Sequence, residues 1–328
     1  MKRIFFFILH TCLLVFATFL VSSFLEGGTH VYQFVRAEGS LPIVQEAITP
    51  KPSFAPFASL VRGTNVLLLG VAGVPYPAPF LTDTIMVGSF QGDPLQLTLT
   101  SLPRDLLVSI PGSARLVKIN SLYELGKTFS PLEPDRFIRE KVEAMTGLSI
   151  PYVAIIDVRG LEAIVDAAGG VDVNVEHDIA DPFFPGPNYS YDPFYLSKGP
   201  HHLNGHDAVR FARSRHSPRG DFDRVRRQQQ LLAAMRDRAG ANKSLAASFV
   251  DLISQLNGHL ITNVTLKDAP LFLGALLTPN LQIAHRIVEN GPSGLLRQFK
   301  TQDGAYALSP NGGIDEYGEI QAFFGELH

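Results

Sequence analysis

The sequence predicts an α/β protein, in which a central mixed sheet is covered by helices on both faces and is preceded by one N-terminal transmembrane helix. Apolar runs typical of strands alternate with helical patterns between residues 65 and 175. This alternation is typical of layered α/β sheets. The short link QGDP at 91–94 suits a hairpin between two of the strands, and residues 4–25 form one uncharged apolar run.

The transmembrane helix is predicted from residues 4–25, which contain no Asp, Glu, Lys or Arg. At ~1.5 Å per residue, a helix of this length crosses a hydrocarbon core of ~30 Å. Lys2 and Arg3 precede the run, whereas Glu26 follows it. By the positive-inside rule, the N-terminus is cytoplasmic and everything after residue 25 lies outside the cell membrane. The alternative interpretation is a cleaved signal peptide.

Three parts of the chain are predicted. Residues 1–25 form a cytoplasmic tip and the transmembrane helix, residues 26–61 a stalk with scattered Gly and Pro, and residues 62–328 one extracytoplasmic domain. The single Cys12 excludes an internal disulfide and a Cys-based zinc finger. The net charge of -3 argues against nucleic acid as a partner.

The elements of the domain follow from its apolar patterns. Strands are expected at 65–71, 84–90, 95–102, 152–158 and 171–175. Helices are expected as a pair within 121–147 and then at 160–170, 204–215 and 221–239. The stretch 181–200, rich in Pro and aromatic residues, is expected to be a long surface loop. A mostly helical region at 241–300 precedes a last strand, a turn and a closing helix within 304–327.

Arginine is unusually dense between residues 206 and 230, which contain seven Arg against three Asp. Arg213 and Arg215 flank the end of one predicted helix, and Arg224 and Gln228 lie at i,i+4 on the next. Because guanidinium groups bind phosphate in two-point geometry, these side chains form a candidate pyrophosphate site. The alternatives are a solvated basic face and, disfavoured by export, a nucleic-acid backbone site.

A second cluster of polar residues lies at the predicted ends of strands. Asp83 precedes one apolar strand, Arg104 follows another, and Lys118 and Asn120 occupy the next loop. Taken singly, each is an ordinary loop residue. Together they supply what phosphoryl transfer needs, namely a carboxylate for Mg²⁺ or for a proton and cations for phosphate oxygens.

Seven ordered blocks of the sequence resemble the LytR-CpsA-Psr family of membrane-anchored envelope enzymes. They are NVLLLG, TDTIMV, LTSLPRDLLVSIPG, KINSLYELG, VDAAGGVDVNV, GPHHLNGHDAVRFARSRHS and GDFDRVRRQQQ. The resemblance is strong over 62–240 and looser to 328. It implies a phosphotransferase that moves a glycopolymer phosphate from a polyprenyl-pyrophosphate carrier to a hydroxyl of peptidoglycan or a related wall glycan. It also implies Mg²⁺ or Mn²⁺ as cofactor, and a lipid pocket between sheet and helices.

The resemblance also implies roles for individual residues. Asp83 would be catalytic and hold the metal, and Arg104 would be catalytic. The pyrophosphate would be bound by Arg104, Lys118, Arg213, Arg215, Arg224 and Gln228. Two positions depart from the family pattern: Ala72 stands where an acidic residue is usual, and Leu81 where Arg is usual. One carboxylate fewer is expected to weaken Mg²⁺ binding.

Two other functions are compatible with the same residues. The first is a polyprenyl-pyrophosphate hydrolase with water as acceptor. The second is a non-catalytic envelope protein that binds pyrophosphate or lipid and has lost activity together with the family residues at Ala72 and Leu81. A transcription regulator is disfavoured by the predicted export of residues 62–328.

Overall fold

The computed structural model describes residues 61–214, 258–265, 281–291, 294–301 and 304–326, and ten single positions at 227, 230, 231, 234, 238, 256, 268, 271, 272 and 275. The predicted transmembrane helix and most of the stalk lie outside the described residues, as do Arg215, Arg224 and Gln228. Within the described part of the chain, no helix is long and apolar enough to cross a bilayer.

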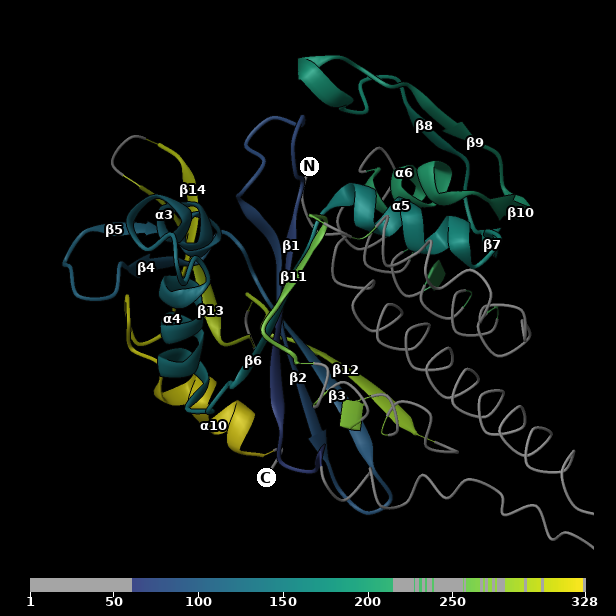
Figure 1. Ribbon diagram of the computed structural model, residues 1–328. Helices are drawn as coiled ribbons and strands as arrows, with labels where there is room; N and C mark the ends of the chain where they lie inside the picture. Colours follow the sequence, from purple (N-terminus) through teal and green to yellow (C-terminus); the bar gives the residue numbers. More distant parts are fainter. Residues whose placement is uncertain are drawn as a thin grey trace, which may run out of the picture.

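A six-stranded mixed sheet forms the centre of the molecule (Figure 1). Its order is β11-β6-β1-β2-β3-β12. The strands are β1 (Asn65–Val71), β2 (Thr82–Gln91), β3 (Gln96–Leu102), β6 (Tyr152–Ile156), β11 (Leu260–Thr262) and β12 (Gln282–Ile287). β2 pairs antiparallel with β1 and β3, whereas β6 runs parallel to β1 and β12 parallel to β3. The predicted mixed sheet is confirmed, and β2 and β3 form the expected hairpin.

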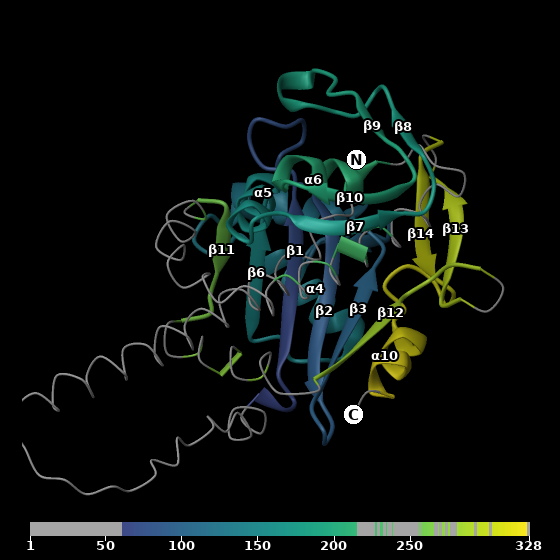
Figure 2. The ribbon, with the colours of Figure 1, turned by 90° about the vertical axis from the view of Figure 1, so that its right-hand side faces the viewer.

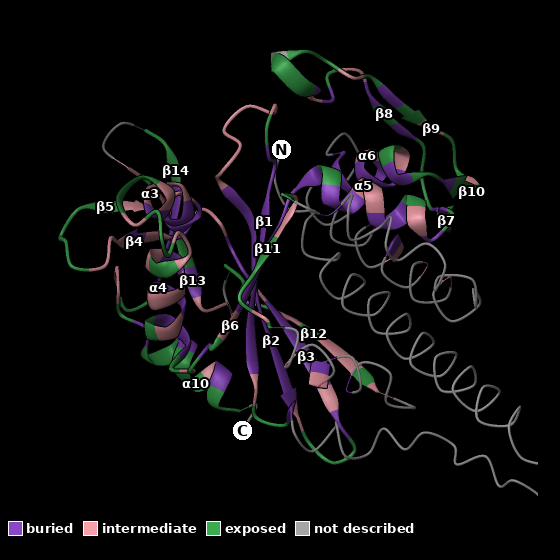
Figure 3. Ribbon diagram, in the orientation of Figure 1, coloured by how far each residue is buried: buried purple, intermediate pink, exposed green. Residues whose placement is uncertain are grey.

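Both faces of the sheet are covered, as predicted. On one face, Leu67 and Leu69 of β1 pack in a core with three helices. These helices are α3 (Leu122–Phe129), α4 (Arg136–Thr146) and α10 (Gly318–Gly325). On the other face, Val66 and Leu68 pack in a core with Phe272. Figure 3 shows the central strands buried along most of their length, which explains the continuous apolar runs of their sequences.

A third core lies between two helices and a group of short strands beside the sheet (Figure 2). The helices are α5 (Val158–Ala167) and α6 (Gly205–Arg213), and the strands are β7 (Val171–Val175), β8 (Ile179–Asp181), β9 (Phe194–Leu196) and β10 (Gly199–Leu203). At Gly205, a Cβ atom would lie 2.2 Å from the Glu162 carbonyl oxygen. The two helices therefore pack closely only because this position is glycine.

Smaller elements complete the described fold. They are β4 (Leu107–Ser109), β5 (Leu116–Lys118), the 3-10 turns η1 (Ile119–Ser121) and η2 (Pro187–Tyr189), β13 (Leu296–Lys300) and β14 (Tyr306–Pro310). The pairs β4–β5, β7–β10, β8–β9 and β13–β14 are antiparallel.

Three predictions about local structure were wrong. The region 241–300 is not mostly helical where it is described, because it contains β11, β12 and β13. The strand expected at 152–158 ends at Ile156, since Asp157 caps α5 and Val158 already belongs to that helix. The stretch 181–200, expected to be a long surface loop, is an arm that contains η2, β9 and the start of β10 and that buries Phe184 and Phe194.

Candidate functional site

Asp83 lies at a break in the pairing of β1 and β2. Gly70 is opposite Thr84 and Val71 is opposite Thr82, so that Asp83 is the extra residue of a β-bulge in β2. Such a β-bulge turns a side chain away from the regular alternation and is common beside active sites. The side chain of Asp83 is 6 % exposed. The bulge thus places a buried carboxylate at the end of the sheet.

Arg104 connects Asp83 to the following loop. Its Nη1 donates to Oδ1 of Asp83 over 3.2 Å, and its Nε lies 3.4 Å from Oδ2 of Asp105. Lys118 Nζ in turn donates to Oδ1 of Asp105 over 2.8 Å. The four charges alternate in sign along this chain of contacts. The predicted Arg104 and Lys118 therefore lie together with Asp83, and both already have carboxylate partners.

Asn120 holds the backbone of this cluster in place. Its N–H donates to the Arg104 carbonyl over 3.3 Å, and its own carbonyl accepts from the Thr82 hydroxyl over 3.2 Å. These bonds join η1 to the end of β3 and the start of β2. In these contacts Asn120 anchors the backbone on either side of the site through its own N–H and carbonyl groups.

Arg213 approaches the site from the last turn of α6. It is 4 % exposed, and its guanidinium carbon lies 5.1 Å from the centroid of the Tyr76 ring and 5.2 Å from that of Phe184. Its Nη1 is buried and has no hydrogen-bond partner in the described part of the chain. A buried cation without a full set of partners is costly, so this geometry favours an anion as the missing partner.

The electrostatics of Arg213 agree with this interpretation. Burial lowers its pKa, while Tyr76, Asp83 and Glu162 act in the opposite direction by stabilising its charge. Burial also raises the pKa of the Tyr76 hydroxyl. Because the charge of Asp83 acts on Arg213, the carboxylate and the helix arginine belong to one electrostatic neighbourhood. Of the predicted arginine cluster, Arg213 is the member that the structure describes, and it lies within the electrostatic reach of Asp83.

Three residues that support Arg213 were not assigned to the site from the sequence. Tyr76 and Phe184 come from the β1–β2 loop and the arm, and form the aromatic surroundings of the guanidinium. Arg227 donates from Nε to the Phe211 carbonyl over 2.9 Å and from Nη2 to the Ser214 carbonyl, which caps the end of α6. The aromatic composition of 181–200 was the only available signal for Phe184. Arg215, Arg224 and Gln228 lie outside the described residues, so their part in the site stays a prediction.

The described residues offer limited support for a bound cation. Asp83 is the carboxylate at the bulge, whereas Ala72 is a buried apolar residue. Among the described residues, no group of three or more His, Cys, Asp or Glu side chains is arranged to hold a metal ion. Mg²⁺ is often held by one or two carboxylates together with substrate phosphates. Asp83 fits such a shared site, in which the substrate supplies the other oxygen ligands.

The fold is α/β, with a buried carboxylate, Asp83, and a buried arginine, Arg213, in one electrostatic neighbourhood. The chain belongs to the LytR-CpsA-Psr family, whose model matches residues 50–287. This confirms the resemblance seen in the sequence motifs.

Two curated relatives match over a little more than half of the chain. The regulatory protein MsrR of Staphylococcus aureus is 32% identical over 193 residues, which are 58% of this chain and 53% of that protein. The polyisoprenyl-teichoic acid–peptidoglycan teichoic acid transferase TagU of Bacillus mycoides is 30% identical over 185 residues, 56% of this chain and 55% of that protein. The chain thus spans about half the length of these relatives.

Solved structures share the fold at lower identity. Protein gbs0355 of Streptococcus agalactiae has a TM-score of 0.62 at 19% identity, over 84% of this chain and 89% of that one. B. subtilis TagV has a TM-score of 0.58 at 22% identity, over 81% and 97%. TagT bound to LI-WTA has a TM-score of 0.58 at 21% identity, over 88% and 98%. At these identities the likeness concerns the fold.

Proposed function

We propose that this protein is a membrane-anchored phosphotransferase. It moves a glycopolymer phosphate from a polyprenyl-pyrophosphate carrier to a hydroxyl of peptidoglycan or a related wall glycan. The single observation that carries the proposal is the buried Arg213, whose Nη1 has no hydrogen-bond partner among the described residues and which lies in the electrostatic reach of Asp83. Family membership and the similarity to TagU, whose name specifies a teichoic acid transfer to peptidoglycan, support the same activity.

The side chains divide the chemistry between them. Arg213 and Arg104 bind the pyrophosphate and stabilise the charge that develops on the leaving lipid phosphate. Asp83 accepts the proton of the attacking hydroxyl or contributes an oxygen to the metal. The 3.2 Å ion pair between Arg104 and Asp83 positions both groups before substrate binds. An anion that binds Arg104 then competes with Asp83 for the guanidinium. Mg²⁺ or Mn²⁺, when bound, would neutralise charge on the phosphate oxygens.

The bond changes are balanced without a further reactant. The acceptor oxygen forms a bond to the glycan-side phosphorus, and the bond from that phosphorus to the bridging oxygen breaks. The lipid phosphate leaves, and the acceptor proton goes to Asp83 and then to solvent. With water as the acceptor, the same steps describe the alternative hydrolase.

The test is an incubation of the full-length protein in detergent with a polyprenyl-pyrophosphate glycan, Mg²⁺ and a wall oligosaccharide, followed by mass spectrometry of the products. Transfer predicts a joined glycan phosphate, whereas hydrolysis predicts free glycan phosphate at the same rate with or without the oligosaccharide. Tight binding of the donor without either product at any Mg²⁺ concentration would favour the non-catalytic alternative.

The variant Asp83→Asn keeps the size of the side chain and removes its charge. We expect the transfer rate to fall by about two orders of magnitude or more, as is typical for the loss of a general base. Donor binding, which depends mainly on arginine, should change little, and the response to added Mg²⁺ should disappear. Asp178→Asn, an exposed acidic residue at the base of the arm, is the matched control. An Asp83→Asn protein as active as wild type would make Asp83 a structural residue.

Membrane anchoring by residues 4–25 is part of the proposal and rests on the sequence pattern. A reporter that is active only outside the cytoplasm, fused after residue 60, should be active in intact cells. Protease added to spheroplasts should digest the domain. Protection of the domain from protease would contradict the proposed localisation at the outer side of the cell membrane.

A further inference from the structure

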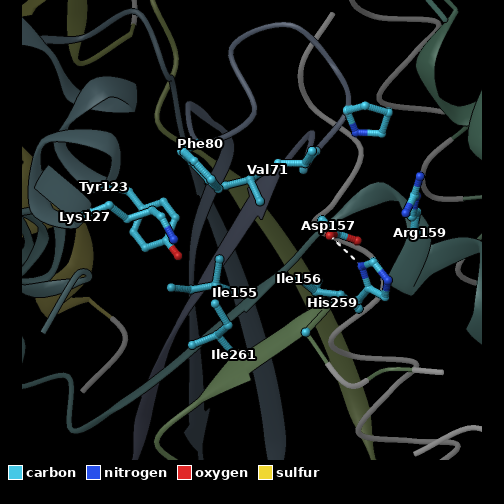
Figure 4. A pocket seen from close by; sticks show the side chains of 14 residues that line it. Val71, Phe80, Tyr123, Lys127, Ile155, Ile156, Asp157, Arg159, His259 and Ile261 are labelled. Atoms are coloured by element: carbon cyan, nitrogen blue, oxygen red, sulfur yellow. Dashed lines mark hydrogen bonds and ion pairs between the residues drawn. The ribbon is translucent and has the colours of Figure 1, made fainter. Parts of the chain in front are cut away.

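A cavity lies beside the β1–β2 loop (Figure 4). It has a volume of about 310 Å³ and is lined by residues of that loop, of α3, of β6 and the start of α5, and of the segment 258–261. Asp83, Arg104 and Arg213 are not among its lining residues. β1 and β6 run parallel and both end at this cavity. The carboxyl ends of parallel strands are a common place for ligands in α/β sheets.

The wall of this cavity contains a fixed carboxylate–imidazole pair. Oδ1 of Asp157 accepts from the Gly160 N–H over 3.0 Å, and its Oδ2 lies 2.7 Å from Nδ1 of His259. A Cβ atom at Gly73 would lie 2.7 Å from the Asp157 carboxylate, so glycine at 73 lets the β1–β2 loop close over the pair. Because Nδ1 of His259 faces Asp157, the remaining polar atom of the ring is Nε2.

The cavity is also lined by two cations that have no ion-pair partner among the described residues. Lys127 of α3 lies with its Nζ 4.2 Å from the centroid of the Phe80 ring. Arg159, in the first turn of α5, is exposed. Figure 4 shows Lys127 on one side of the cavity and Arg159 with His259 on the other. Against these two positive charges the lining has one carboxylate, Asp157, which already accepts two hydrogen bonds.

The remaining lining suits the body of a small organic molecule. Val71, Ile155 and Ile156 form an apolar floor next to Tyr123. The volume lies at the lower end of the range of ~300–1,000 Å³ that is usual for small-molecule sites. A hydrocarbon chain would desolvate Lys127, Arg159 and Asp157 without offering hydrogen bonds in return. A ligand with an anionic group satisfies the two cations, and its body covers the floor.

We propose that this cavity binds a small organic anion, with Lys127 and Arg159 as partners of its carboxylate or phosphate group and the Asp157–His259 pair as an oriented wall. The proposal concerns a site separate from that of the transferred phosphate. Its test uses neither donor nor acceptor, so a failure of the proposed transferase activity leaves it unaffected.

The experiment titrates the full-length protein, labelled with ¹⁵N at histidine, with glucuronate, glucose 6-phosphate or glucose. These three probes share one sugar body and carry a carboxylate, a phosphate or no charge. We expect the anions to shift the ring signals of His259, assigned with a His259→Gln variant, and glucose to leave them unchanged. A response to glucuronate alone identifies a carboxylate site, and a response to glucose 6-phosphate alone identifies a phosphate site.

Variants decide whether the cations are responsible. Lys127→Met and Arg159→Gln should each weaken binding of the responding anion by about fivefold, as expected for a partly exposed charge-assisted contact. The exposed Lys198→Met and Arg115→Gln are matched controls and should bind as wild type does. Arg213→Met should also leave the His259 response intact.

Three results would overturn the proposal. The first is a His259 spectrum that no anion shifts. The second is binding that Lys127→Met and Arg159→Gln leave unchanged but Arg213→Met abolishes, because the anion would then occupy the site at Asp83. The third is a His259 shift caused by geranylgeraniol and not by either anion, which would make the cavity a hydrocarbon site.

Discussion

The two sides of the candidate site differ in how their charged side chains are paired. On the sheet side, Asp83, Arg104, Asp105 and Lys118 form an alternating chain of ion pairs. On the helix side, Arg213 is more deeply buried than Arg104 and rests on aromatic rings, with one nitrogen unpartnered in the described part of the chain. Paired charges fix geometry, whereas a buried cation without its partners raises the free energy of the unliganded protein.

This difference indicates where binding energy resides. An anion that reaches Arg213 removes an electrostatic cost, because it supplies a partner for Nη1 that the described residues do not. An anion that reaches Arg104 or Lys118 must compete with Asp83 or Asp105 for the same donors. We therefore expect the helix side to dominate affinity and the sheet side to dominate positioning.

The largest effect is expected at Arg213. Arg213→Met should weaken binding of geranylgeranyl pyrophosphate by about 10–100-fold, since it removes a charge-assisted contact worth ~1.5–3 kcal/mol. It should not lower the free energy of unfolding, because it also removes an incompletely partnered buried charge. Calorimetry and urea unfolding of the full-length protein in detergent measure the two quantities.

Arg210 is the matched control for that variant. It lies one turn earlier on α6 and is paired with Asp192 at 3.0 Å and with Asp207. Arg210→Met should lower the free energy of unfolding by about 1–2 kcal/mol and leave pyrophosphate affinity nearly unchanged. Equal losses of affinity in both variants would mean that the arginines act as a diffuse basic surface.

A smaller effect is expected at Lys118. Its side chain is 34% exposed, and its ammonium group is bound to Asp105. Lys118→Met should therefore weaken pyrophosphate binding no more than about twofold, because an exposed ion pair contributes little net energy. A tenfold loss in the same calorimetric titration would show that Lys118 leaves Asp105 for the ligand, and the contrast between the two sides would fail.

The smallest effect is expected at a charge cluster outside the predicted site, formed by Asp315 with Ser109, Lys141 and Tyr317. Burial alone would raise the pKa of Asp315. Hydrogen bonds from Ser109, Tyr317 and Lys141 outweigh burial and lower this pKa. A lowered pKa means that the stabilisation is present above the unfolded value of about 3.9 and is lost as pH falls through the folded pKa. The bonds join the segment before α10 to β4 and to α4.

Asp315→Asn should reduce the urea midpoint at pH 7 and flatten its decline between pH 5 and pH 3, with a change below about 1 kcal/mol. Asp93→Asn, an exposed carboxylate paired with Arg62 at 3.4 Å, should behave as wild type does. Neither variant should alter pyrophosphate affinity. If the stability of Asp315→Asn depended on pH as that of wild type does, the hydrogen bonds to Asp315 would not contribute to stability. The comparison of this cluster with the ion pairs of the sheet side would then fail.

Much of the fold was predictable because local patterns and tertiary structure agree. Continuous apolar runs such as 65–71 are buried on both faces of the sheet, and the Gly and Pro residues mark most element ends. Prediction failed where short strands depend on partners far along the chain. β11 pairs with β6 and β12 with β3. Such edge strands are short and half exposed, so their own sequences resemble helices or loops.

The charged residues of the candidate site could be named from the sequence, whereas their burial and contacts could not. Asp83, Arg104 and Arg213 stood out by residue type and position. The bulge at Asp83, the aromatic rings around Arg213 and the pairing of Lys118 with Asp105 require contacts between distant segments. Composition alone does not distinguish a solvated arginine from a buried one, and burial is what gives Arg213 its expected effect.

The most direct test of the proposed site is whether Arg104 of the sheet side and Arg213 of the helix side bind the same anion. Arg104 and Arg213 have no contact with each other among the described interactions, so coupling between them in ligand binding passes through the ligand or through Asp83, whose charge acts on both. A double-mutant cycle with Arg104→Met and Arg213→Met, measured by calorimetry with geranylgeranyl pyrophosphate, isolates this coupling. The account predicts a coupling energy above about 0.5 kcal/mol, with the double variant losing less affinity than the sum of the single losses. Additive losses would contradict it, because the two arginines would then act on independent sites.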